Sequence, residues 1–468
     1  MRRVTASEAA GLCEGRLYGA DVDLSRRWQS DSRDVGPGDA FVAIKGAKTD
    51  GHIFLNQVVK GGAKLLLVSL AEIDNIPINS PEYEGVSVIA VPDTTVGMSR
   101  IAQMYLQAVS PQVVAITGSV GKTTTRELAV SALGSVYKIH SAVKSYNTVI
   151  GCSLTILSMP YDTEFLILEL GTNHFGEIAE MVSLFPPETA VITEVAPAHL
   201  EGFGDIDGVL KAKLEICRSL KLKQIIYNGD NALLRERMLN GYQEIKKISV
   251  GHNSDDTLKI ADISIVLEDS GAAVSVSYLF KDEEITCNVP LFGLQHSYNI
   301  GYAVALGRLF NVDKSLLKNA LAKSHPISGR GVCRRALNGS WVIDESYNAN
   351  PNSMNAAIMN VLNINKNNSY RLVAVLGGMR ELGETAALWH QKIIDKTKCF
   401  DTVVFLGEEW YDSKLAVPEN MLRYKTYSEA LQKLRETDIS RAIVLVKGSN
   451  SYGLNRLVRE LTEGIYDC

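Results

Sequence analysis

From residue 109 onward, apolar residues gather in short continuous runs, and each run is followed by a stretch with the period of a helix. The first four runs are "VVAIT", "FLILEL", "TAVITEV" and "KQIIYNG". Continuous apolar strands that alternate with helices are typical of a largely parallel sheet covered by helices. The pattern therefore predicts an α/β fold for this part of the chain.

Two changes in the pattern divide the chain into three regions. Residues 1–108 carry shorter strand-like runs, such as "AFVAI" and "VSVIAV", separated by Gly, Pro and Asp, which predicts a small α/β domain rich in loops. Near residue 325, "SHPISGRG" interrupts the alternation and is typical of a linker. The alternation then resumes with "SWVID", "YRLVAVLGG", "DTVVFLG" and "RAIVLVKGS". We therefore expect three α/β domains, at 1–108, 109–324 and 325–468.

The composition of the chain excludes several kinds of binding partner and several classes of protein. The 468 residues exceed what one core supports, and the net charge of −5 gives no basic field for nucleic acid or an anionic membrane. The 7 cysteines are scattered without CxxC spacing, so we expect reduced thiols in a cytoplasmic protein. The N-terminus has no apolar run after its arginines, which argues against a signal peptide, and no window reaches the length of a membrane span.

The segment "VVAITGSVGKTTTRELAVSAL" joins a strand, a glycine turn and a helix directly. Glycines in such a turn let backbone N–H groups approach a phosphate, and the helix start adds positive potential. Lys122 is then placed for the β- and γ-phosphates, and Thr123 for Mg²⁺. Ile116 stands where the longer phosphate-loop pattern needs glycine, so the match is to GxxGKT. A chance glycine turn is the alternative, but the flanking elements favour a nucleotide site formed by Gly118, Ser119, Gly121, Lys122, Thr123 and Thr124.

Polar side chains follow two further strands. Glu169 stands near the end of "FLILEL", and His199 follows "TAVITEV". Because the carboxyl ends of parallel strands share one edge with the phosphate loop, both are candidate metal ligands; a solvated glutamate and a structural histidine are the alternatives. The next helix carries Lys211 and Lys213, and spacing alone favours solvated lysines on an amphipathic helix.

The polar run "DESYNANPNSM", residues 344–354, comes directly after an apolar strand. Most such runs are surface loops. Together with "TGSVGKTTT", "LELGTNH", "AHLEGFG", "KAK" and the "GR" of Gly329–Arg330, however, it occurs in the order and spacing of the Mur ligases. The chain resembles that family over essentially its whole length. "SYNANP" is the most specific part of the resemblance, and the phosphate loop is the least specific.

Within the family, "SYNANP", "LGGMRELG" and "LVKGS" resemble the branch that joins D-Ala-D-Ala to UDP-N-acetylmuramoyl-tripeptide in peptidoglycan synthesis. The N-terminal "SDSRDVGPGDAFVAIKGAKTDGH" resembles the UDP-sugar-binding domain of that branch. The resemblance implies a UDP-binding domain, a central P-loop ATPase domain and a C-terminal Rossmann-like domain. It also implies a monomer that uses ATP and two Mg²⁺ ions and closes around residue 325. The reaction would pass through an acyl phosphate.

The same resemblance implies a role for each matching residue. Lys122 would bridge the β- and γ-phosphates, and Lys213 would carry a carbamate formed from CO₂. The metal ligands would be Thr123, Glu169, His199 and the carbamate of Lys213. Asn299, Arg330 and Asp344 would contact ATP; Ser32, Arg33 and Asn147 the UDP-substrate; and Tyr347, Asn348 and Asn350 the incoming D-Ala-D-Ala.

Four positions depart from the family pattern. Glu194 stands where Asn is usual, and Gln295 where His is frequent; both lie near the expected nucleotide. Gly378 stands where Asp is common, and Asn450 where Arg is common; both lie in loops of the third domain.

Three rival functions follow from the same residues. A ligase that adds the third amino acid of the peptide would carry a DNPR-type motif, which is absent here. A folylpolyglutamate-type ligase shares the central fold, but the "SDSR" segment argues for a UDP-sugar. A catalytically silent ATP-binding scaffold is disfavoured because Lys122, Glu169, His199 and Lys213 are all retained.

Overall fold

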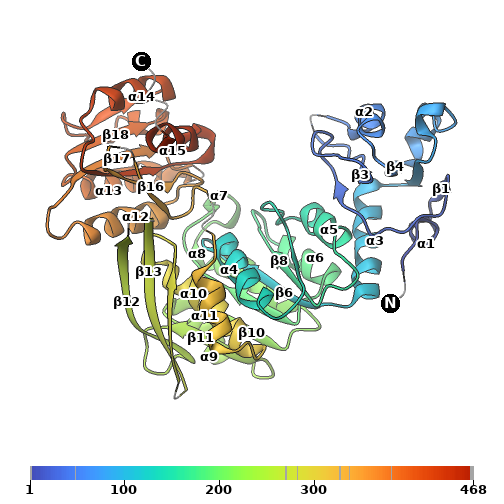
Figure 1. Ribbon diagram of the computed structural model, residues 1–468, viewed down its shortest axis with the longest axis horizontal. Coiled ribbons are helices and arrows are strands. Elements are labelled where there is room, and N and C mark those ends of the chain that lie inside the picture. Colours follow the sequence, from blue (N-terminus) through green and yellow to red (C-terminus); the bar gives the residue numbers. More distant parts are fainter. Residues whose placement is uncertain are drawn as a thin grey trace. The chain divides into compact units, whose positions relative to one another are not determined.

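The computed structural model describes residues 3–47, 49–268, 271–281, 283–325, 328–336, 338–380 and 382–463. Pro326 and Ile327, in the predicted hinge, lie outside the described residues, as do Lys48, Glu381 and Cys468. The chain divides into two compact units, and the elements are labelled in Figure 1. Unit 1 comprises 1–117, 136–191 and 214–225, and unit 2 comprises 118–135, 192–213 and 226–468.

The N-terminal part of unit 1 is a five-stranded sheet in the order β1-β5-β4-β3-β2. Only β1 runs antiparallel to its neighbour. The strands are β1 (Arg16–Tyr18), β2 (Trp28–Gln29), β3 (Ala40–Val42), β4 (Leu65–Ser69) and β5 (Ser87–Val91), and the helices are α1 (Ala6–Leu12), η1 (Gly51–Phe54), α2 (Leu55–Lys60), η2 (Leu70–Asn75), η3 (Pro81–Tyr83) and α3 (Thr94–Val109). Phe41, Leu66 and Val88 of the sheet pack with Leu55 and Val58 of α2, as expected for a small α/β domain.

The rest of unit 1 contains three parallel strands in the order β6-β8-β7. They are β6 (Gln112–Thr117), β7 (Ile139–Ser141) and β8 (Phe165–Glu169), and the helices are α5 (Val149–Leu157), α6 (Glu177–Leu184) and η4 (Leu214–Arg218). All five residues of β8 are buried, as its continuous apolar run predicted. The boundary between the units falls within β9 (Thr189–Ile192) and β10 (Gln224–Asn228).

Unit 2 begins with α4 (Lys122–Gly134), which packs against α10 (His296–Leu309). Its other helices before the linker are α7 (Leu200–Phe203), α8 (Ile206–Lys213), α9 (Ala232–Asn240) and α11 (Lys314–Ala322). Strand β11 (Lys246–Gly251) is parallel to β12 (Leu258–Glu268), whereas β12, β13 (Gly271–Phe280) and β14 (Glu283–Val289) are antiparallel. The apolar runs of the sequence did not predict the strands in 258–289. Burial in β13 largely alternates, as in an antiparallel sheet with one covered face.

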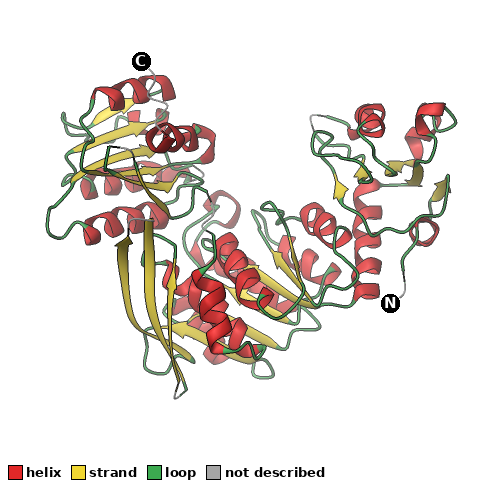
Figure 2. Ribbon diagram, viewed as in Figure 1, coloured by secondary structure: helices red, strands yellow, loops and turns green. Residues whose placement is uncertain are grey.

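The C-terminal part of unit 2 is a six-stranded sheet in the order β15-β16-β20-β17-β18-β19, parallel except for β15. The strands are β15 (Val332–Arg335), β16 (Trp341–Glu345), β17 (Arg371–Gly377), β18 (Thr402–Leu406), β19 (Leu422–Tyr424) and β20 (Ala442–Lys447). Helices cover both faces (Figure 2). They are α12 (Pro351–Ile364), α13 (Ala386–Lys396), α14 (Tyr427–Glu436) and α15 (Leu454–Glu463), with short turns η5 (Gly383–Thr385), η6 (Glu408–Tyr411) and η7 (Asn450–Tyr452).

Adjacent strands β17 and β20 lead to opposite faces of this sheet. Helix α13 follows β17 and packs on one face through Ile393 and Ile394. Helix α15 follows β20 and packs on the other face through Leu454 and Leu457. In parallel sheets such a switch point opens a ligand-binding edge at the carboxyl ends of the strands. The protein thus has the expected three-domain α/β architecture with mostly parallel sheets. Within the described residues, no helix has the length and apolar character needed to cross a membrane.

Candidate active-site residues

The phosphate loop has the predicted strand–turn–helix geometry. Strand β6 ends at Thr117 and α4 begins at Lys122, with Gly121 as its N-cap at φ +86°. A Cβ at Gly118, where φ is +145°, would lie 2.0 Å from Thr193 Oγ1. A Cβ at Gly121 would lie 2.6 Å from Asn299 Oδ1. Both glycines are therefore required by backbone conformation and by close approach.

The segment after β9 holds the loop in shape. The Ser119 N–H donates to Glu194 O at 2.8 Å, and the Ser119 hydroxyl donates to Ala196 O at 2.9 Å. The Thr193 hydroxyl donates to Val120 O at 2.6 Å. Lys122 Nζ lies 2.6 Å from Gly118 O, so the ammonium group folds back over the loop. Thr123 and Thr124 are buried in the first turn of α4.

Glu194, one of the four residues that depart from the family pattern, also belongs to the segment that holds the phosphate loop in shape. Its carboxylate accepts hydrogen bonds from the side-chain amides of Asn228, at 2.6 Å, and Asn231. Burial raises the pKa of Glu194 despite these hydrogen bonds. The contact with the phosphate loop uses the backbone carbonyl of residue 194, which does not depend on the side chain.

Asn299 lies beneath the loop, where it links two helices. Its Oδ1 accepts from the Thr125 hydroxyl at 3.2 Å, and its Nδ2 lies 3.0 Å from His296 Nδ1. Because Nδ1 accepts from the amide, the proton of neutral His296 is on Nε2. Burial lowers the pKa of His296 to about 4. A hydrogen bond with the Phe292 backbone opposes this shift. His296 was not among the predicted site residues, because nothing in the sequence around it indicates that it is buried.

Glu169 and Asn147 are brought together within unit 1. Glu169 is the last residue of β8 and is paired with Ile116 of β6. Asn147 Nδ2 lies 3.5 Å from Glu169 Oε1. A Cβ at Gly171 would lie 2.8 Å from the Asn147 side chain, so the glycine leaves room for it. The candidate metal ligand therefore contacts the candidate UDP-substrate residue.

Ser32 and Arg33 lie in a turn that is tied to the same region. Arg33, which is exposed, pairs with Asp31 at 2.5 Å, and its hydrogen bonds lower the pKa of that carboxyl. The neighbouring Asp34 pairs with Lys144 at 2.5 Å. The Lys144–Asp34 pair therefore links the "SDSR" turn to the segment that carries Asn147, three residues farther along the chain.

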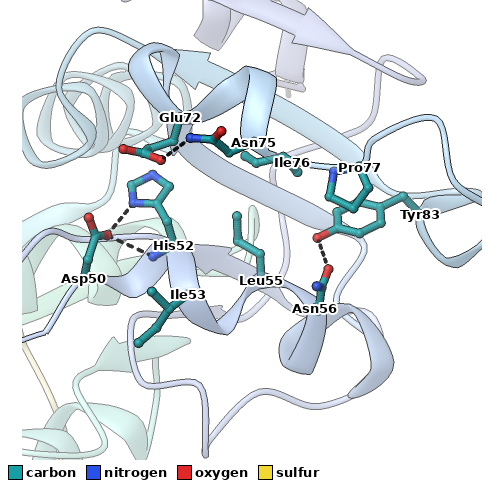
Figure 3. Close-up of a pocket in the computed structure, with 10 residues that line it drawn as sticks. All are labelled: Asp50, His52, Ile53, Leu55, Asn56, Glu72, Asn75, Ile76, Pro77 and Tyr83. Carbon is teal, nitrogen blue, oxygen red and sulfur yellow. Dashed lines mark hydrogen bonds and ion pairs between the residues drawn. The ribbon is translucent and has the colours of Figure 1, made fainter.

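A pocket of about 240 Å³ lies elsewhere in the N-terminal sheet domain (Figure 3). His52 Nδ1 contacts Asp50 at 2.6 Å, and His52 Nε2 accepts from Ser69 N at 2.9 Å. Both ring nitrogens are thus engaged in fixing the turn at η1 to the end of β4. The pocket is lined by Asp50, His52, Ile53, Leu55, Asn56, Glu72, Asn75, Ile76, Pro77 and Tyr83, and neither Ser32 nor Arg33 belongs to this lining.

His199 and Lys213 occupy special positions in unit 2. His199 is the N-cap of α7 and has a left-handed backbone, with φ +52°. Such a conformation is strained for a non-glycine residue and is frequent at functional sites. Lys213 ends α8 and is only 2% exposed, whereas Lys211 is exposed. Burial therefore distinguishes Lys213 from Lys211, which their spacing in the sequence could not do. Among the described residues, no group of three His, Cys, Asp or Glu side chains could hold a metal ion.

Arg330 and Tyr347 lie together at the start of the third domain. The Arg330 guanidinium lies 4.1 Å from the centre of the Tyr347 ring. Asp344 fixes this arrangement, because Oδ2 accepts from Gly329 N at 2.8 Å and Oδ1 from the Ser346 hydroxyl at 2.6 Å. Its carboxylate thus has an internal role in addition to any contact with ATP.

The "SYNANP" loop is also anchored from within. Asn350 caps α12, since its Oδ1 accepts from Ser353 N at 2.8 Å. The ammonium group of Lys447 donates to Asn348 O at 3.0 Å and pairs with Glu345 at 3.3 Å. Lys447 is buried, and burial raises the pKa of Glu345. The loop is therefore a packed part of the carboxyl edge of the sheet.

Family models match three parts of the chain. Residues 28–105 match the Mur ligase family catalytic domain, residues 116–307 the Mur ligase middle domain, and residues 329–450 the Mur ligase glutamate ligase domain.

Curated relatives match along nearly the whole chain. The chain is 32% identical to UDP-N-acetylmuramoyl-tripeptide--D-alanyl-D-alanine ligase of Escherichia coli (strain K12), over 99% of both chains. It is 30% identical to the Bacillus subtilis (strain 168) enzyme of the same name, over 93% of this chain and 92% of the relative.

Solved structures show the same fold. MurF from Acinetobacter baumannii superposes with a TM-score of 0.83 and 25% identity, covering 99% of both chains. MurF ligase from Thermotoga maritima, solved in complex with ADP, gives a TM-score of 0.79 and 25% identity, covering 94% of this chain and 98% of that one. These matches confirm the resemblance read from the sequence motifs: the chain belongs to the Mur ligase family, in its MurF group.

Proposed function

We propose that this protein is the ATP-dependent ligase that joins D-Ala-D-Ala to UDP-N-acetylmuramoyl-tripeptide. The observation that carries the proposal is the 32% identity over 99% of both chains with the relative that bears this activity in its name. The phosphate loop would bind ATP, and the carboxyl edge of the six-stranded sheet would bind the incoming dipeptide.

The reaction begins with activation of a carboxylate. The terminal carboxylate of the tripeptide attacks the γ-phosphorus of ATP, giving an acyl phosphate and ADP. The amine of D-Ala-D-Ala then attacks the acyl carbon, and inorganic phosphate leaves as the amide forms. Backbone N–H groups at Gly118 and Gly121 and the Lys122 ammonium bind the phosphates. Lys122 must leave Gly118 O to do so, and its charge then offsets the charge on the β- and γ-phosphates.

The residues proposed as metal ligands suit Mg²⁺. Thr123 would supply a hydroxyl, Glu169 a carboxylate and a carbamate on Lys213 two further oxygens, all of which are oxygen ligands of the kind that Mg²⁺ prefers; His199 would add an imidazole nitrogen. The carbamate forms when the neutral amine of Lys213 adds to CO₂ and loses one proton. We assign the carbamate to Lys213 because Lys213 is buried, whereas Lys211 is exposed. Two Mg²⁺ ions, when bound, would neutralise the phosphate charge.

The remaining residues position the substrates. We assign Ser32, Arg33 and Asn147 to the UDP-substrate, and Asn299, Arg330 and Asp344 to ATP. Tyr347, Asn348 and Asn350 would face the dipeptide, since asparagine side chains can donate to and accept from its peptide groups. For Asn350 this contact would use the Nδ2 amide, because Oδ1 caps α12.

The organisation of the working enzyme is part of the proposal. The domains would be 1–108 for the UDP-sugar, 109–324 for ATP and 325–468 for the dipeptide. We propose a cytoplasmic monomer whose third domain closes when the ligands bind. Small-angle scattering with an ATP analogue and the UDP-substrate should show compaction of a particle of monomer size.

Mass spectrometry of the product tests the activity. The protein is incubated with ATP, Mg²⁺ and one of two substrate pairs: UDP-muramoyl tripeptide with D-Ala-D-Ala, or UDP-muramoyl dipeptide with a diamino acid. The proposal predicts UDP-muramoyl pentapeptide and one ADP per product from the first pair only. Product from the second pair alone would assign the protein to the neighbouring step, and no product from either would leave an ATP-binding scaffold.

A further inference from the structure

Three loops meet at the carboxyl edge of the six-stranded sheet through a cluster that the sequence analysis did not single out. Arg380 follows β17, Glu409 follows β18 in η6, and Tyr452 follows β20 in η7. Arg380 Nε lies 3.4 Å from Glu409 Oε1, and the Tyr452 hydroxyl donates to Glu409 Oε2. The Arg380 guanidinium also lies 5.1 Å from the centre of the Tyr452 ring. One carboxylate thus links the loops that surround the switch point.

Two glycines at the strand ends, Gly378 and Gly407, leave the space that the side chains of this cluster occupy. A Cβ at Gly378 would lie 2.5 Å from Glu409 Oε2 and 3.0 Å from Glu409 Cβ. A Cβ at Gly407 would lie 2.3 Å from the Tyr452 hydroxyl oxygen. The Glu409 side chain therefore fills the space into which a side chain at position 378 would project.

Gly378 is not required by its backbone conformation. Its backbone is not in the left-handed region, so a residue with a side chain could adopt the same conformation once space is available. The carboxylate at this point of the edge comes from the loop after β18, and an aspartate at position 378 would supply one from the loop after β17.

We propose that Glu409 acts as a positioning residue, holding Arg380 so that its guanidinium binds the carboxylate of the incoming dipeptide. This deepens the proposed function and rests on it. Arg380 retains 53% exposure of its side chain, whereas Glu409 retains 25%. Glu409 and Tyr452 thus hold the guanidinium while leaving part of it open, and a guanidinium binds a carboxylate through paired N–H groups.

Exchanging the two positions tests the proposal. The variants are Glu409→Ala, Gly378→Asp and the double variant, with Glu408→Ala as the matched control. Glu408 is the adjacent residue, 71% exposed, and it pairs only with Lys425 in the described part of the chain. Steady-state phosphate release gives kcat and the KM values for ATP and for D-Ala-D-Ala.

Glu409→Ala should raise the KM for D-Ala-D-Ala about tenfold, the scale of one charge-assisted hydrogen bond, with kcat and the KM for ATP within about twofold of the wild type. Gly378→Asp alone should weaken dipeptide binding as well, because the new side chain meets Glu409. The double variant should recover to within about threefold of the wild type, since the carboxylate is restored. A merely structural role would move both KM values together and would give no recovery.

Thermal unfolding separates this inference from the activity. The double variant should melt closer to the wild type than Gly378→Asp does, whatever the protein catalyses. Equal melting of the double and the Gly378→Asp variant, or Glu409→Ala kinetics equal to those of Glu408→Ala, would overturn the inference. A wild type without dipeptide-dependent phosphate release would instead overturn the proposed function, even if the melting temperatures showed the exchange.

Discussion

The phosphate loop and the carboxyl edge of the six-stranded sheet are built in different ways. The loop is one contiguous segment whose shape depends on glycines and on hydrogen bonds with Thr193, Glu194 and Ala196, each of which is accepted by a backbone carbonyl. The edge is assembled from side chains far apart in sequence: Arg380 and Glu409 are 29 residues apart, and Glu409 and Tyr452 are 43. A site built from the backbone tolerates little change. A site built from side chains can receive the same chemical group from more than one loop.

A large effect is expected at Lys213, where the central domain would depend on a modified side chain and not on its backbone. Lys213→Ala should lower the ligation rate about 100-fold, the upper range for disturbing a metal site. Lys211→Ala, which changes an exposed lysine two residues away, should have little effect. A carbamate carbon signal after incubation with ¹³C-bicarbonate should be present in Lys211→Ala and absent in Lys213→Ala. Equal losses in the two variants would contradict the assignment.

The free energy of unfolding should depend on pH because of His296, which contacts Asn299 beneath the phosphate loop. Burial lowers the pKa of folded His296 to about 4 from the ordinary 6.5. Between those values the unfolded chain binds a proton that the folded protein does not, so stability falls as pH decreases. From about pH 7 to pH 5 the loss amounts to about 2 kcal/mol.

Urea unfolding of the wild type and His296→Gln at both pH values checks this. The variant should lack this part of the pH dependence. Identical dependence in the two proteins would mean that His296 is not held neutral.

Gly118→Ala tests whether the phosphate loop relies on its backbone. The new Cβ would collide with Thr193 Oγ1, so the loop must shift, and strain of this kind corresponds to about a tenfold rise in the KM for ATP. Gly339→Ala is the control, because Gly339 has φ +82° with nothing within 4 Å of its Cβ position. It carries the conformational cost without the collision. A similar rise in the KM for ATP in both variants would contradict the claim that the collision with Thr193 is the cause.

The smallest effect separates two roles of Asn350. Asn350→Ala should lower the free energy of unfolding by about 1 kcal/mol, because α12 loses its cap. Asn350→Ser should keep most of that stability, since serine caps equally well. If the Asn350 side-chain amide contacts the dipeptide, the serine variant will still show a higher KM for D-Ala-D-Ala. An unchanged KM would leave Asn350 with the structural role alone.

Contiguous features could be predicted from the sequence. The strand–turn–helix around Gly118, the strand that ends at Glu169, and the strands before and after the third-domain loops all appear as apolar runs next to turn residues. Their signals are local, because each depends on neighbours within a few residues. The α/β class followed from the same runs.

Features that depend on tertiary packing could not be predicted. The antiparallel strands β12–β14 carry alternating, partly exposed residues, which give a weaker signal than a buried run. The burial of Lys213 against the exposure of Lys211 depends on how α8 packs. The space beside Gly378 is filled by the Glu409 side chain from another loop, and no local sequence pattern predicts a contact between distant loops.

Phosphate release with ATP, Mg²⁺ and UDP-muramoyl tripeptide, measured with and without D-Ala-D-Ala, tests the central claim most directly. The account predicts release that requires the dipeptide and falls about 10³-fold in Lys122→Ala, the scale for removing a group that stabilises transition-state charge. Release that does not respond to the dipeptide, and appears instead with UDP-muramoyl dipeptide and a diamino acid, would contradict it.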